Sequence, residues 1–238
     1  MKNWKKTLEL GCICIIMFVV WTLLIQLVDV QPSGQNGTNI GFASFNTWFH
    51  KLTGVNMIIY TITDWLGLVA IFVCLGFGMV GLVQWIKRRS LCKIDKDIII
   101  LGLYYIVVIL SYGVFEIIPM NYRPILINGR MEASYPSSTT LLILCVMPTL
   151  VEQINRRCKN ALVKRIVCII TVLFSAYMVI GRLISGVHWF TDIVGALLLG
   201  VGLFELYKGF VAVYVKRKTV QQLNVNSIPQ PQSPSGKR

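Results

Sequence analysis

Long apolar runs alternate with short polar connections along the chain. Each run approaches the roughly 20 mostly apolar residues that a helix needs to cross the hydrocarbon core of a bilayer. We therefore predict six transmembrane helices, at Leu8–Val28, Trp65–Ile86, Ile98–Ile118, Ser138–Ile154, Ile166–Ile184 and Phe190–Val215. The predicted fold class is an all-α polytopic membrane bundle formed by residues 1–218. The segment 219–238 is polar and contains prolines, so we expect it to be a disordered tail.

Lysine and arginine are distributed unevenly among the connections. With the N-terminus placed in the cytoplasm, 19 of the 23 basic residues fall in cytoplasmic segments. Only Lys51, Arg123, Arg130 and Arg182 lie outside. Cytoplasmic loops of membrane proteins carry an excess of lysine and arginine. We therefore predict that both termini are cytoplasmic and that the protein is a multi-pass plasma membrane protein.

Composition supports a membrane protein and argues against other classes. The chain is 55% hydrophobic and 14% charged, whereas soluble domains are about 25% charged. The net charge of +13 does not indicate a nucleic-acid partner, because the basic residues form short clusters between apolar runs. The seven cysteines fall in apolar runs or predicted cytoplasmic connections, and none forms a CxxC pair. We therefore expect neither structural disulfides nor a metal site, and no cofactor is implied.

One predicted outer loop, residues 31–56, contains "FNTWFHKL". The spacing of its aromatic residues is typical of a helix that lies in the membrane interface. We expect His50, within this stretch, to be an interfacial residue.

Two outer segments hold most of the polar chemistry, "NYRPILINGRMEASYPSSTT" and "GRLISGVHWFTD". His188 and Asp192 are four positions apart, so a helix start would place them on one face. The carboxylate could then orient the imidazole and stabilise its cationic form. Two arginines and a serine-rich helix N-terminus would bind an anionic phosphoryl group.

Each of these residues also has an ordinary structural explanation. Arg182 could extend to the lipid headgroups. Asp192 could interact with the dipole of the last helix, and Ser137 and Ser138 could cap the fourth. The combination is what favours a functional site.

The stretch "RLISGVHWFTD" resembles the third signature of the type 2 phosphatidic acid phosphatase superfamily, in which arginine, histidine and aspartate have this spacing. "YRP" at 122–124 resembles the end of the first signature, and "YPSST" at 135–139 resembles the second. The resemblance implies that His188 attacks phosphorus to give a phosphohistidine and that Asp192 assists it. It also implies a phosphorylated membrane lipid as substrate, bound at the outer face without a metal. The implied phosphate-binding groups are Arg123, Arg182 and the backbone N–H groups of Ser137 and Ser138.

The chain departs from the family pattern at four positions. Glu116 stands where the first signature has lysine, and Gly181 replaces the serine before Arg182. In the second signature, Ser138 replaces glycine and Thr139 replaces the histidine that acts as the family's general acid. General acid catalysis typically contributes about 10²–10⁴-fold. A phosphomonoester leaving group, with a pKa near 6, can depart without that proton, so we favour a lipid diphosphate of the polyprenyl type as substrate.

Several substitutes for the missing acid remain open. His50 is the only other histidine, and Glu116 or Glu132 could carry a proton if burial raised its pKa. Alternatively, Glu116 could pair with Arg130 and neutralise the site. The functional alternatives to a phosphatase are a lipid phosphotransferase and a catalytically degenerate protein that binds or transports phosphorylated lipids.

Overall fold

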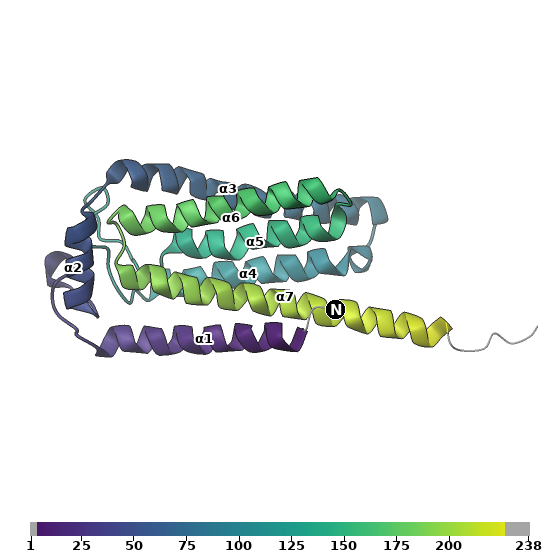
Figure 1. Cartoon of the computed structure of the whole chain (residues 1–238), viewed down its shortest axis with the longest axis horizontal. Coiled ribbons are helices and arrows are strands. Elements are labelled where there is room, and N and C mark those ends of the chain that lie inside the picture. Colours follow the sequence, from purple (N-terminus) through teal and green to yellow (C-terminus); the bar gives the residue numbers. More distant parts are fainter. Residues whose placement is uncertain (1–3, 227–238) are drawn as a thin grey trace, which may run out of the picture.

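The computed structural model describes residues 4–226 of the chain, with side chains described to residue 214. These residues form an elongated helical bundle (Figure 1). Its α-helices are α1 (Trp4–Leu27), α2 (Ala43–Thr53), α3 (Met57–Arg88), α4 (Lys96–Ile117), α5 (Ser138–Arg157), α6 (Ala161–Ile184) and α7 (Phe190–Asn226). Short 3-10 turns, η1 and η2, lie at Gln35–Gly37 and Leu91–Lys93, and the described residues contain no β-strand.

Six of these helices, all except α2, are long and apolar enough to cross a membrane. The prediction of an all-α bundle with six spans is therefore confirmed. The N-terminal end of α1 and the C-terminal end of α7 both lie away from α2, toward the opposite end of the bundle (Figure 1). Which end faces the cytoplasm stays a prediction from the charge distribution.

The largest differences between predicted and observed boundaries are at the second and the last span. The second span begins at Met57 rather than at Trp65, so it includes polar residues that lie between the predicted loop and the predicted span. Their hydroxyls fit inside the helix because Thr61 and Thr63 donate hydrogen bonds to carbonyl oxygens one turn earlier. Helix α7 runs to Asn226 and includes residues 219–226 of the predicted tail. The predicted disorder of 227–238 lies outside the described residues.

Helix α2 lies across the end of the bundle (Figure 1) and includes the stretch 45–52 that the sequence predicted to be helical. Its buried Asn46 accepts a hydrogen bond from the Thr191 amide at 3.3 Å and donates one to the Thr191 hydroxyl at 3.0 Å. On the other side of α2, Trp48 and Leu52 are exposed. The helix therefore has one face bound to the start of α7 and one apolar face, and its contact with a membrane interface stays a prediction.

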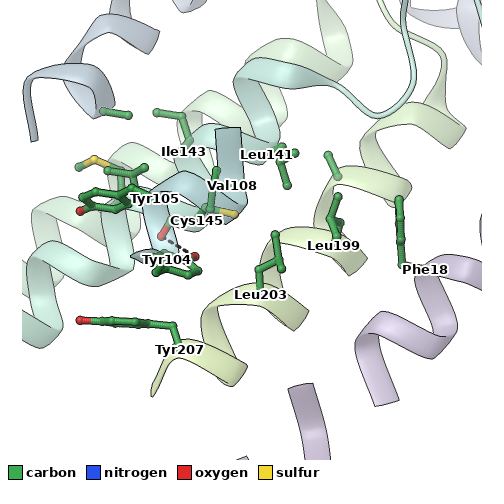
Figure 2. Packing of buried hydrophobic residues seen from close by; sticks show 14 of the residues in the cluster. Phe18, Tyr104, Tyr105, Val108, Leu141, Ile143, Cys145, Leu199, Leu203 and Tyr207 are labelled. Atoms are coloured by element: carbon green, nitrogen blue, oxygen red, sulfur yellow. Dashed lines mark hydrogen bonds between the residues drawn. The ribbon is translucent and has the colours of Figure 1, made fainter. Parts of the chain in front are cut away.

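The core lies along α5 and α7, the most buried of the spans. The hydroxyl of Tyr104 donates to the Cys145 carbonyl at 3.0 Å, and its ring stacks on Tyr207 at 4.8 Å between centroids (Figure 2). Glycines let α1 approach α7 closely, since a Cβ on Gly202 would lie 2.8 Å from Ile15. The large apolar side chains on the outer surfaces of the spans remain exposed, as expected of helices that face lipid.

The turn between α6 and α7 is held tightly against the turn between α2 and α3. The Asn56 amide donates to the Ser185 carbonyl at 2.9 Å, and Nε2 of His50 donates to the Gly186 carbonyl at 3.0 Å. Gly186 has a φ of +68°, and a Cβ placed on it would lie 1.9 Å from the carbonyl oxygen of Gly54. The position therefore requires glycine for both backbone conformation and space.

We expect Gly186→Ala to destabilise the protein. A side chain in this conformation costs about 1–3 kcal/mol, and the clash with Gly54 adds to that cost. Thermal unfolding in detergent micelles measures the effect. The matched control is Gly78→Ala within α3, where a Cβ meets nothing within 4 Å. Equal melting temperatures for the two variants would contradict the prediction.

Candidate active site

The predicted site residues come together at the α2 end of the bundle. His188 lies in the α6–α7 turn, Arg182 in the last turn of α6 and Asp192 in the first turn of α7. All three are buried, with exposed fractions of 3%, 0% and 0%. The loop between α4 and α5 supplies Arg123, also buried. Residues from both outer polar segments therefore meet in one buried cluster.

The two ring nitrogens of His188 have different partners. Nε2 lies 3.2 Å from Nη2 of Arg182. Because a guanidinium can only donate, Nε2 accepts and keeps its lone pair. The proton of the neutral ring is therefore on Nδ1, which lies 3.2 Å from the carbonyl oxygen of Ser134. In this tautomer Nε2 is the unprotonated ring nitrogen.

Asp192 supports the turn that carries His188. Its Oδ2 accepts a hydrogen bond from the Trp189 amide at 2.9 Å, and Oδ1 accepts one from Asn121 at 3.3 Å. The Ser134 hydroxyl also donates to Oδ2 and lies 3.2 Å from His188 Nδ1.

The expected placement of both residues on one helix face is therefore wrong, because α7 begins at Phe190, after the histidine. The carboxylate lies 3.8 Å from Nδ1 and reaches the ring through Ser134. Ser134 and Asn121 were not recognised in the sequence, since isolated polar residues in a loop give no signal of their own.

A tyrosine of α3 lies between the two arginines. The guanidinium carbons of Arg182 and Arg123 lie 4.8 and 5.7 Å from the Tyr60 ring centroid. Each guanidinium also pairs with one acid, Arg182 with Asp64 at 3.4 Å and Arg123 with Glu132 at 3.2 Å. The sequence did not indicate Tyr60, and Asp64 had no assigned role, although an acid close to an apolar run is a general signal of function.

Both arginines retain an unused donor. Among the described residues, the buried side-chain nitrogen and oxygen atoms without a partner are Nε of Arg123, Nε of Arg182 and the hydroxyl of Ser175. A buried charged donor without an acceptor is costly. Two of them in one buried cluster fit a site that binds an anion.

Two adjoining cavities open beside this cluster. One of about 280 Å³ has mostly polar walls, and the other, also about 280 Å³, has mostly apolar walls. Tyr112 and Ser138 line both. Arg123, Glu116 and Glu132 line the polar cavity, whereas Asp64, Thr139 and side chains of α3, α4 and α5 line the apolar one.

The serines at the start of α5 have different positions. The Ser137 amide donates to the Asp192 carbonyl at 3.3 Å and its hydroxyl donates to Thr140 at 3.0 Å. That amide is therefore used within the protein, which corrects the expected role of Ser137 in the phosphate cradle. Ser138 lines both cavities, and its part in a phosphate cradle stays a prediction.

The residues considered as substitute acids are dispersed. Glu116 lines the polar cavity, while Arg130 is exposed in the hairpin turn that it closes with Ile127. The expected Glu116–Arg130 pair is wrong, because it is absent from the ion pairs of the described residues. His50 fastens the α6–α7 turn through its bond to Gly186.

Comparison with known proteins places this arrangement in a family. The model of the PAP2 superfamily matches residues 97–214, about half of the chain, including His188 and both arginines. The chain belongs to the PAP2 superfamily. A solved structure, the transmembrane PAP2-type phosphatidylglycerolphosphate phosphatase from Bacillus subtilis, is similar with a TM-score of 0.61 and 20% identity. The similarity covers 85% of this chain and 96% of that one, so the PAP2 membrane fold extends through most of the molecule. No curated protein matches the sequence.

Within this PAP2 fold, burial sets the protonation state of the histidine. Burial lowers the pKa of His188 well below 6.5, and the positive charges of Arg182 and Arg123 lower it further. The ring is therefore neutral at physiological pH, as a nucleophile requires. Within residues 4–226, no three His, Cys, Asp or Glu side chains form a group that could hold a metal ion.

The same shift predicts how stability depends on pH. Below pH 6.5 the unfolded chain protonates His188 while the folded protein does not. Stability therefore falls as the pH drops below 6.5 and rises as the pH returns. His188→Gln removes this titration, so the gap between its melting temperature and that of the wild type should shift in favour of the variant on acidification. Melting curves from pH 7.5 to about 5 test this, and a gap that is constant with pH would contradict it.

Proposed function

We propose that this PAP2 protein is an integral membrane phosphatase that hydrolyses a phosphorylated lipid through a phosphohistidine on His188. The favoured substrate is a lipid diphosphate of the polyprenyl type, with a lipid phosphate as the alternative. The site faces the extracytoplasmic side of the plasma membrane. The distribution of lysine and arginine supports that orientation, because the basic connections lie at the opposite end of the bundle.

One observation carries the proposal. The lone pair of a neutral histidine lies beside a guanidinium, and two neighbouring arginines have buried Nε atoms without partners. A phosphoryl group placed among them would satisfy both donors. Phosphoryl transfer depends mainly on positioning and on stabilising the charge of the three equatorial oxygens. The arginines would supply both while Nε2 attacks phosphorus.

The paired cavities support an amphiphilic substrate. The polar cavity adjoins Arg123, and the apolar cavity is walled by Leu68, Ile71 and Ile109 of the α3 and α4 spans. A lipid can place its charged head in the first and the start of its hydrocarbon chain in the second. A soluble phosphate ester would leave the apolar walls uncovered.

The environment of Thr139 supports the diphosphate. Its γ-methyl lies 3.2 Å from where a Cβ on Gly67 would be, and the residue lines the apolar cavity. It therefore supplies no acid for a leaving alkoxide. A lipid phosphate leaving from a diphosphate, with a pKa near 6, needs none.

A trapped intermediate tests the reaction. We expect purified protein mixed with a short-chain polyprenyl diphosphate, radiolabelled at the terminal phosphorus, to form an alkali-stable and acid-labile phosphoenzyme within the first turnover. His188→Ala should form none and lose turnover. Label without release of inorganic phosphate, but with transfer to an added lipid alcohol, would indicate a phosphotransferase. Absence of label and turnover in the wild type would favour a binding protein.

Restoring the missing acid should change the substrate preference. Thr139→His has room in the adjoining cavity of about 280 Å³. We expect it to raise hydrolysis of phosphatidic acid about tenfold or more, within the range of general acid catalysis, and to change polyprenyl diphosphate hydrolysis much less. Thr139→Gln, similar in size without a titrating group, is the control. Wild-type protein that hydrolyses phosphatidic acid faster than the diphosphate would contradict the preference.

A further inference from the structure

Apart from Asp192, Asp64 is an acid that is connected to His188 through a single residue, Arg182. Nη1 of Arg182 lies 3.4 Å from Oδ1 of Asp64, and Nη2 of the same guanidinium lies 3.2 Å from Nε2 of His188. One planar group therefore bridges the carboxylate and the attacking atom.

This carboxylate also has access to water. Its side chain is 56% exposed, whereas that of Arg182 is 1% exposed. Asp64 lies about 36 Å along α3 from Arg88, at roughly 1.5 Å of rise per residue. That length exceeds the hydrocarbon thickness of about 30 Å. With the basic end of α3 at one membrane surface, Asp64 therefore lies at the other surface rather than in the hydrocarbon.

The second half of a phosphohistidine reaction needs a base. Water must lose a proton as it attacks phosphorus, and Thr139 has no group that accepts it near neutral pH. Asp64 lines the same cavity as Thr139. The carboxylate and the position from which the family's histidine is missing therefore open onto the same cavity.

We propose that Asp64 is the general base that activates water for hydrolysis of the phosphohistidine, an inference that rests on the proposed function. In the first step Nε2 of His188 forms a bond to phosphorus, and the electron pair of the broken P–O bond leaves on the lipid phosphate. In the second step the oxygen of water bonds to phosphorus and one of its protons passes to Asp64. The electron pair of the N–P bond returns to Nε2, inorganic phosphate departs, and Asp64 releases the proton to solvent.

Other candidate bases fit less well. Glu132 pairs with Arg123. Among the described residues, the hydrogen bonds of the His188 ring are with Arg182 and Ser134 and not with Arg123. Glu116 lines the polar cavity, away from Thr139. His50 uses Nε2 to hold Gly186.

Asp64→Asn separates this role from a structural one. The amide oxygen still accepts the hydrogen bond from Arg182, but the amide takes no proton from water. We expect the variant to form the radiolabelled phosphoenzyme at a rate within about tenfold of the wild type while steady-state turnover falls about 100-fold or more, the range of general base catalysis. Phosphoenzyme should accumulate to nearly one per site. Rapid-quench kinetics with the polyprenyl diphosphate measures both steps.

Chemical rescue and a matched acid complete the test. Turnover of Asp64→Ala should rise on addition of formate, which fits the exposed position and restores a carboxylate. Glu132→Gln removes the carboxylate that pairs with Arg123. This variant should form the phosphoenzyme more slowly, and the phosphoenzyme should not accumulate.

The outcomes separate the two proposals. If Asp64→Asn slows formation and turnover by the same factor, or if formate restores nothing, Asp64 only positions Arg182 and the inference is wrong. If the wild type forms no phosphohistidine, the proposed function itself fails.

Discussion

The burial of one guanidinium determines how this end of the bundle is built. Arg182 is completely buried at the end of α6, and a buried cation needs partners that are themselves held in place. Asp64 and Tyr60 provide them from one turn of α3, and His188 provides an acceptor from the adjacent loop. The position of the nucleophile, the approach of α3 to α6 and the closed form of the α6–α7 turn therefore depend on the same charge.

The α6–α7 turn is fixed from three sides by hydrogen bonds. Asp192 caps the start of α7, Asn46 of α2 binds Thr191, and Nε2 of His50 holds the Gly186 carbonyl. These contacts use side chains that are far apart in the sequence to set a single ring. Under the proposed function, a His188 nucleophile held in this way would require little reorganisation when the substrate arrives, which is how positioning lowers the barrier of phosphoryl transfer.

Two acids of the site are paired with its two arginines. Arg123 and Arg182 each carry one carboxylate partner, Glu132 and Asp64, and each keeps a free Nε. The positive charge that binds a phosphoryl group is therefore partly balanced before substrate arrives. Under the proposed function, with threonine in place of the acid histidine, this chemistry suits a substrate whose leaving group needs no proton and a second step assisted by a carboxylate.

The amino-acid sequence alone determined the membrane class, the six spans and the residues that carry the third signature. Apolar runs as long as a bilayer permit few other folds, and the spacing of Arg182, His188 and Asp192 is local along the chain. Tertiary structure decided the rest. Ser134, Tyr60 and Asp64 enter the site from other segments, where each is indistinguishable from an ordinary loop or helix-end residue.

The start of α3 shows the same limit, because hydrogen bonds from Thr61 and Thr63 to the backbone let polar residues continue an apolar helix. The local spacing of His188 and Asp192 predicted that both lie on one helix face, but the helix begins after the histidine, and Ser134 contacts both side chains. Contacts of this kind arise only when distant segments are packed together, since a buried guanidinium pairs with whichever acceptors, and a buried carboxylate with whichever donors, the fold brings to it.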